Sequence, residues 1–83
     1  MSEQEIGVVT LYYSHLQVGI IQLSAALKTG DTVRIKGIHD DFTQIVDSMQ
    51  VEHKKLEQAN AGDFVGVKMS QKAHEHDKVY RVE

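Results

Sequence analysis

The 83-residue sequence contains no cysteine, no proline and no tryptophan. Without cysteine, the chain has neither disulfides nor thiolate metal ligands. Its start, MSEQEIG, lacks the basic and long apolar regions of a secretory signal, and no apolar run approaches the length of a transmembrane helix. These absences predict a cytoplasmic protein that does not associate with a membrane.

Motifs for catalysis are also absent from the sequence. No GxSxG elbow presents a nucleophile, and the neighbouring acids Asp40 and Asp41 are typical of a turn rather than of an acid and base pair. His74, Glu75 and His76 have some metal-binding character, but a structural zinc site needs about four ligands, and no cysteine or patterned third histidine lies close in sequence. We therefore predict no enzymatic activity, no metal and no cofactor.

A Gly-Asp pair followed by an alternating apolar run is the clearest structural pattern in the chain. It occurs as GDTVRIK from Gly30, as GDFVGVK from Gly62, and as a weaker third copy from Asp77. Glycine adopts a positive φ at no steric cost and aspartate bonds a nearby backbone amide, so each pair predicts a chain reversal before a strand. Valines every second residue are typical of a half-buried strand.

The full pattern predicts a single domain over residues 1–83, with residues 1–5 disordered and a first strand that is apolar on both faces. The predicted strands are residues 6–13, 18–23, 32–36, 42–51, 64–69 and 78–83. Gly19 suggests a bulge or a sharp bend, and Asp47 suggests a kink or bulge in a long strand whose inner face carries Ile45, Met49 and Val51. Residues 24–29 suggest a short helical turn, and residues 52–60 a loop, with Leu56 and Ala59 towards the core, that plugs one end. Short strands at this spacing favour an all-β, closed or nearly closed antiparallel barrel.

The stretches GDTVRIKG, DSMQVEHKKLEQANAGDFVGVKM and DKVY resemble the second domain of translational GTPases such as elongation factor Tu, elongation factor 1-alpha and initiation factor 2. The resemblance covers residues 6–82 and extends to small translation elongation factor-like proteins. It rests on Gly30, Asp31, Ser48, Met49, Ala59, Gly62, Asp63, Val65 and Gly66. It implies a six-stranded antiparallel Greek-key β-barrel. Barrels of this type also occur at the C-terminus of some collagenase-like peptidase family proteins.

The chain has no GxxxxGK[ST] loop, so the resemblance does not extend to GTP binding. It implies a non-catalytic binding module for a ribosome-, RNA- or translation-associated partner. The alternative is a protein-interaction adaptor for a separately encoded enzyme of the collagenase-like peptidase type.

The formal charge of −3 opposes affinity based on phosphate contacts, although a local basic and aromatic patch would favour them. Phe64 alternates away from Val65 and Val67, so it either packs under a loop or marks a contact surface. The candidate partner-binding surface comprises Arg34, Lys36, His53, Lys54, Lys55, Phe64 and Lys68.

Overall fold

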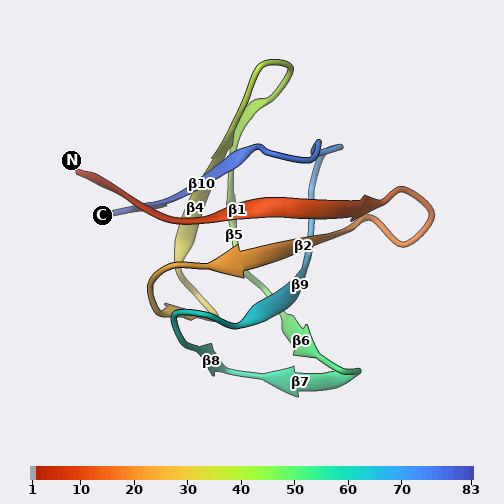
Figure 1. The fold of residues 1–83 in the computed structure, drawn as a ribbon. Coiled ribbons are helices and arrows are strands. Elements are labelled where there is room, and N and C mark those ends of the chain that lie inside the picture. The colour runs from red at the N-terminus through yellow and green to blue at the C-terminus, as the bar shows by residue number, and fades with distance from the viewer. Residues whose placement is uncertain (1) are drawn as a thin grey trace.

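A computed structural model describes residues 2–83, in which the regular secondary structure consists of ten β-strands (Figure 1). The strands are β1 (Glu3–Tyr13), β2 (Val18–Leu23), β3 (Leu27–Lys28), β4 (Thr32–Lys36), β5 (Asp41–Ile45), β6 (Met49–Val51), β7 (Lys54–Leu56), β8 (Gln58–Ala59), β9 (Phe64–Lys68) and β10 (Lys78–Val82). Within these residues, no helix has the length and apolar character needed to cross a bilayer. The predicted all-β architecture is confirmed.

Eight of these strands form one antiparallel sheet in the order β5-β4-β10-β1-β2-β9-β6-β7, while β3 and β8 form a separate pair. The long strand β1 lies between β2 and β10, so the first and last strands run side by side and the two chain ends lie close together (Figure 1). No backbone ladder joins β5 to β7 among residues 2–83, so a closed six-stranded barrel is not detected. The sheet has two edges instead of none.

The start of β1 differs from the sequence prediction. Residues 3–5 were expected to lie outside the fold, but Glu3, Gln4 and Glu5 pair with residues of β10. All three side chains are exposed, so no apolar alternation marks them as strand in the sequence. Their order comes from backbone pairing with a strand almost eighty residues away in the chain. Met1 lies outside the described residues.

The inward-facing side chains of the strands form one apolar core. In β4, Val33 and Ile35 are fully buried, and in β9 Val65 and Val67 are fully buried, as the alternation predicts. The buried core residues are Ile6, Val9, Ile21, Leu23, Leu27, Val33, Ile35, Phe42, Val46, Met49, Ala59, Val65, Val67, Met69, Ala73 and Val79.

One four-residue turn occurs three times, each time before a strand of the large sheet. In each copy the N–H of the final aspartate donates to the carbonyl three residues earlier, and the N–H of that earlier residue donates to the aspartate Oδ2. The third residue has a positive φ: 92° at Gly30, 93° at Gly62 and 75° at His76. The predicted Gly-Asp turns are confirmed, and the weaker third copy adopts the same turn with histidine in the glycine position.

The strand predicted over residues 42–51 is two strands, β5 and β6, separated at Val46–Ser48, which confirms the kink near Asp47. The inner-face assignment of Ile45 is wrong: Ile45 is 57% exposed, whereas Val46 is fully buried. The N–H of Val46 donates to the carbonyl of Asp31, and the carbonyl of Val46 accepts from Gly30. These bonds hold Val46 against the first Gly-Asp turn and direct its side chain into the core.

Two segments predicted to be helical or irregular contain strands. Residues 24–29 contain β3, and residues 52–60 contain β7 and β8, with Leu27 paired to Ala59. Ala59 is buried and Leu56 packs against the core, so their predicted direction is confirmed although the predicted loop is not. Short strands with exposed lysines and glutamine carry too little alternation to be recognised in sequence.

Gly19 does not form the expected bulge. The register of the β1–β2 pair shifts between Val9 and Leu11, on the other strand. Gly19 faces Met69, whose Cε would collide with a Cβ at this position. The glycine therefore makes room for a core methionine.

Candidate functional site

The structure distributes the seven candidate partner-binding residues over separate parts of the sheet. Arg34 and Lys36 lie on β4, and three strands, β10, β1 and β2, separate β4 from β9, which carries Phe64 and Lys68. Lys54 and Lys55 belong to the edge strand β7, and His53 lies in the turn before it at a φ of 67°. Lys55, Phe64 and Lys68 lie on the part of the sheet formed by β9, β6 and β7, and the β4 residues lie elsewhere.

The guanidinium of Arg34 is engaged within the protein. Its Nε lies 2.7 Å from Asp41 Oδ1, and its Nη1 lies 3.2 Å from Glu3 Oε2. The hydrogen bonds that the guanidinium donates to Asp41, and then those to Glu3, raise the pKa of Arg34 above its usual value. Arg34 therefore joins β4, β5 and the start of β1.

A group of apolar side chains covers the outer side of three neighbouring strands, and we call it the apolar face: Val8, Leu11, Tyr13, Val18, Ile20 and Phe64. Leu11, Tyr13 and Phe64 are 44%, 47% and 53% exposed. Leu11 pairs with Ile20, Tyr13 with Val18, and Phe64 with Gln22. Directly opposite residues in an antiparallel pair have neighbouring side chains. Leu11, Tyr13, Val18 and Ile20 therefore form one surface, and Val8 and Phe64, on either side of Gln22, lie diagonally opposite Ile20 at its border.

A bulge in β1 creates this face. The one-residue register shift between Val9 and Leu11 leaves Thr10 without an opposite residue, and Thr10 Oγ1 donates to the carbonyl of Ile20. Because a strand alternates its side chains, the extra residue turns Leu11 and Tyr13 outwards while Val9 stays in the core. The sequence signal was the apolar character of both faces of residues 6–13, and the bulge explains it.

Glycine in the centre of β9 lets apolar side chains lie close to the sheet. A Cβ at Gly66 would stand 3.3 Å from Val18 Cγ1 and 3.6 Å from Ile20 Cδ1. Val18 and Ile20 thus spread over the backbone of β9 and join the β1 and β9 parts of the apolar face.

The charged side chains within the strands next to the apolar face are mostly lysines. Residues 6–13 of β1 and the whole of β2, β6, β7 and β9 contain no aspartate or glutamate, although the chain has twelve. They contain three lysines, of which Lys68 pairs with Val18 and Lys55 pairs with Gln50, the neighbour of Gly66. The apolar face therefore has a basic rim in a protein of net negative charge.

A second cluster joins Asp40, His74 and Asp77 beneath the β4–β5 turn. His74 Nδ1 lies 2.6 Å from Asp40 Oδ2, and the His39 ring is 5.3 Å from that of His74. Asp77 is only 3% exposed, and its Oδ2 accepts the backbone N–H of His74. The sequence grouped His74 with Glu75 and His76, whereas the fold groups it with an acid 34 residues earlier.

The two carboxyl groups in this cluster have opposite pKa shifts. Burial, followed by the hydrogen bond with Asp40, raises the pKa of Asp77. Burial alone would raise the pKa of Asp40, but hydrogen bonds from Asp77 and His74 outweigh it and lower the pKa. Asp77 therefore keeps its proton to a higher pH than Asp40 does. One atom from each of Asp40, His74 and Asp77 lies within 4.8 Å of the others, close enough to share an ion, but Asp77 Oδ2 already accepts the His74 N–H and Asp40 Oδ2 already bonds the His74 ring. We assign the cluster a structural role.

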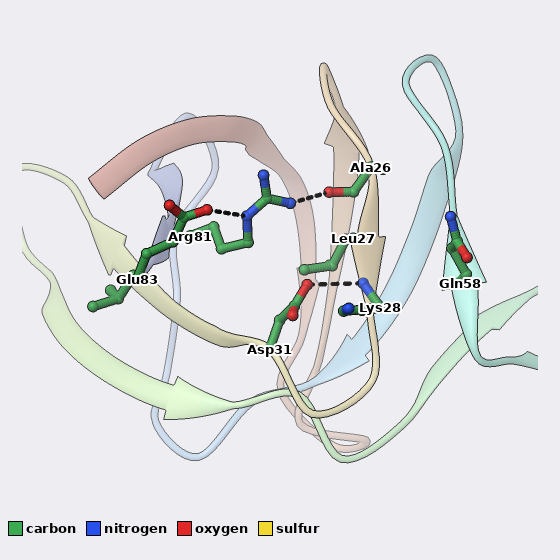
Figure 2. Close-up of a pocket in the computed structure, with 8 residues that line it drawn as sticks. Ala26, Leu27, Lys28, Asp31, Gln58, Arg81 and Glu83 are labelled. Carbon is green, nitrogen blue, oxygen red and sulfur yellow. Dashed lines mark hydrogen bonds and ion pairs between the residues drawn. The ribbon is translucent and has the colours of Figure 1, made fainter. Parts of the chain in front are cut away.

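A pocket of about 410 Å³ lies where β3, β8 and the end of β10 meet (Figure 2). Its lining consists of Ala26, Leu27, Lys28, Asp31, Gln58, Arg81, Val82 and Glu83. Figure 2 shows the Arg81 guanidinium between the Ala26 carbonyl, at 2.7 Å, and the Glu83 carboxylate, at 3.5 Å. Asp31 accepts the N–H of Lys28. Arg81, Glu83 and Asp31 thus already have partners within the protein, so a charged ligand that bound them would have to displace these contacts.

A further pocket of about 510 Å³ borders the His39 and His74 rings, and Tyr12, Ser14, Lys72, Ala73 and Glu75 complete its lining. Nothing in it adds a third group to the His74–Asp40 pair within hydrogen-bonding reach.

Comparison of the sequence with known proteins shows similarity to a protein named a protease. No protein-family model matches this chain. Over 77 residues, 92% of this chain, it is 42% identical to a protein of Methanocaldococcus jannaschii named an uncharacterized protease. The chain spans only 19% of that relative's length.

Two solved structures have the same fold, and both are of the C-terminal domain of a putative U32 peptidase from Geobacillus thermoleovorans. The first has a TM-score of 0.90 at 19% identity, covering 96% of this chain and 93% of the other. The selenomethionine variant has a TM-score of 0.87 at 20% identity, covering 92% and 96%.

These matches correct the resemblance to translation-factor second domains and the translation-linked function inferred from it. The Gly-Asp turns that carried much of that resemblance belong to a turn that this chain uses before three of its strands, so they report a local turn conformation. Similarity to a protein named a protease extends over nearly the whole chain. The alternative function, an adaptor of peptidase type, agrees better with this finding than the ribosome- or RNA-associated one.

Proposed function

We propose that this chain is a non-catalytic protein-binding domain that serves a peptidase-type catalytic unit. The observation that carries the proposal is the 42% identity over 77 residues to one fifth of a protein named a protease. Most of that protein's length lies outside the match, so in that relative a domain of this kind accompanies a much larger polypeptide. We extend the same association to this chain.

A non-catalytic role is supported by what the polar residues already do. Asp77 holds the backbone of the third turn, Asp40 holds His74, and Arg34 joins two strands and the start of β1. A general base or nucleophile needs a group free to react with a substrate. Each of these groups is instead bonded to another group of the same chain, and we infer that these bonds maintain the fold.

We also propose that the sheet curves into the six-stranded Greek-key barrel that the sequence predicts. The support is a side-chain link between the edge strand β5 and the end of β9: Gln44 Nε2 donates to the carbonyl of Lys68 at 2.7 Å. A sheet linked in this way would hold its outer face rigid, which favours binding to a partner.

The test is capture from a lysate of the source organism with the tagged chain as bait, washed at low and moderate salt, with and without nuclease. We expect a polypeptide related to the unmatched part of the protease relative to be retained through both treatments. Retention of ribosomal RNA or ribosomal proteins alone would refute the proposal, as would the absence of a peptidase-type polypeptide. In a parallel assay, the isolated chain should not cleave a denatured protein substrate.

A further inference from the structure

We infer that the apolar face, defined above by Val8, Leu11, Tyr13, Val18, Ile20 and Phe64, is the surface that docks the peptidase-type catalytic unit. This inference rests on the proposed function and names the surface through which it operates. Its occupant is a folded partner with an apolar contact patch and an acidic border.

Continuity distinguishes this surface from scattered exposed apolar residues. Single exposed leucines are ordinary on soluble proteins, whereas contiguous patches mark interaction sites. Here Leu11, Tyr13 and Phe64 are each about half exposed, and the half-buried Val18 and Ile20 connect them across neighbouring strands. Leu16, 63% exposed in the β1–β2 turn, extends the surface beyond Tyr13.

The sheet order restricts how a partner can bind. β1 lies between β10 and β2, β2 between β1 and β9, and β9 between β2 and β6. The centres of these strands are paired on both sides, and only short ends, such as Leu11–Tyr13 of β1 and Phe64–Val65 of β9, have a ladder partner on one side alone, so an extended peptide has no long edge to join. The partner must therefore pack side chains against this face, as a folded surface does.

Charge selects between a different protein and a second copy of this chain. Lys55 and Lys68 lie beside the apolar face, and the strands that form it carry no acid apart from the first residues of β1. A two-fold dimer through this face would bring the lysines of both copies to the same interface, where Glu5 of β1 already pairs with Lys78. A partner with carboxylates around an apolar patch is complementary, and such complementarity speeds association and fixes orientation.

The other large exposed apolar residues do not extend this surface. Ile38 is 95% exposed in the β4–β5 turn and Ile45 is 57% exposed on β5, the far edge of the sheet order. Acids lie near both in sequence: Asp40 and Asp41 follow Ile38, and Asp47 follows Ile45. They provide controls because they are exposed apolar side chains that lie outside the apolar face.

The experiment repeats the capture with three baits: the unchanged chain, the double variant Leu11→Gln/Phe64→Gln, and the control Ile38→Gln/Ile45→Gln. Each substitution is at an exposed site, so thermal melts should stay close to that of the unchanged chain. We expect the double variant to retain the peptidase-type polypeptide at least about tenfold less, because large apolar and aromatic anchors dominate interface energies. The control should retain it fully.

Each other outcome counts against a specific statement. If the unchanged chain captures the peptidase-type polypeptide and the double variant captures it equally, the proposed function stands and the docking surface is wrong. If the unchanged chain captures none, the proposed function fails and this inference with it. If the double variant instead loses an unrelated protein or an RNA, the face has another occupant and the inference is overturned.

Self-association is checked by sedimentation of the unchanged chain and the double variant. A dimer that the double variant dissociates would make a second copy the occupant and overturn the inference. Lys55→Glu/Lys68→Glu gives an independent readout of the acidic border: capture should weaken at low salt, and the difference from the unchanged chain should shrink at moderate salt. An increase in capture by this variant would exclude an acidic border.

Discussion

The side-chain amide of Gln44 forms hydrogen bonds with the backbone next to Ser70 in the way that a backbone amide of a neighbouring strand would. Gln44 Oε1 accepts the N–H of Ser70 at 2.7 Å, and Gln44 Nε2 donates to the carbonyl of Lys68 at 2.7 Å. One amide thus makes both an accepted and a donated bond, the pattern of a backbone pair in an antiparallel ladder. It links the open edge of β5 to the segment that follows β9.

We expect Gln44→Ala to lower the free energy of unfolding by about 1 kcal/mol, because two exposed hydrogen bonds are lost and water replaces part of their energy. Urea unfolding measures the change. Gln22→Ala, on the outer side of β2, is the control and should have little effect on stability. Equal stability of the two variants would show that the Gln44 link contributes nothing to the sheet.

The sequence reveals the inner face of a strand only where apolar and polar residues alternate along it without interruption. Where strands alternate without a break, as at Val33 and Ile35, the inner face follows directly from the sequence. At Ile45 and Val46 it does not, because the chain breaks between β5 and β6 and the alternation restarts. Backbone bonds from Val46 to the first Gly-Asp turn decide which of the two is buried, and residues distant in sequence supply those bonds.

The candidate site was predictable only in part for a similar reason. Phe64 was identified because it alternates away from Val65, and it lies on the apolar face. Leu11 and Tyr13 were not among the seven candidate residues. A bulge at Thr10 turns them outwards, and the position of a bulge is hard to recognise in the sequence of a strand that is apolar on both faces. Arg34 was chosen for its charge, but its partners Asp41 and Glu3 are visible only in three dimensions.

The second Gly-Asp turn allows a test of backbone conformation alone. Gly62 has a φ of 93°, and no atom would lie within 4 Å of an added Cβ. We expect Gly62→Ala to destabilise the fold by about 1–2 kcal/mol, because residues with a Cβ disfavour this conformation. Gly62→Asn should cost less, since asparagine tolerates positive φ. Thermal or urea unfolding of the pair measures both, and an alanine variant as stable as the asparagine variant would contradict this explanation.

The cluster around Asp77 should make stability depend on pH in a defined direction. Folding raises the pKa of Asp77 above the ordinary 3.8, so the folded chain keeps this proton to higher pH than the unfolded chain does. Its contribution to stability is complete below the ordinary pKa and is lost as pH rises through the raised one. The lowered pKa of Asp40 acts oppositely: its contribution is present above the ordinary pKa and is lost as pH falls through the lowered one.

Asp77→Asn keeps an acceptor for the His74 N–H and a donor towards Asp40 at every pH. We expect this variant to lose the decline in stability that the unchanged protein shows above the ordinary aspartate pKa. Thermal melts from acidic to neutral pH measure the decline, with His74 and His39 as the other titratable groups near Asp40. Asp63→Asn, at the matching position of the second turn, is the control and should leave the decline in place. A decline that survives Asp77→Asn would assign it to another group.

Arg34 should contribute to the fold and not to partner binding. Its bonds to Asp41 and Glu3 are exposed to solvent, which screens ion pairs and leaves them a small net contribution to stability. We therefore expect Arg34→Gln to lower the free energy of unfolding only slightly, and by less still at high salt. Urea unfolding at two salt concentrations measures this loss.

The same variant tests which part of the basic surface matters for the proposed partner. Arg34→Gln should capture the peptidase-type polypeptide as well as the unchanged chain does, because three strands separate β4 from β9 and the Arg34 guanidinium already has internal partners. Lys36→Gln, on the same strand, is the matched control without that ion-pair network and should also capture normally. Loss of capture on Arg34→Gln, with stability unchanged, would move the docking surface to β4 and β5.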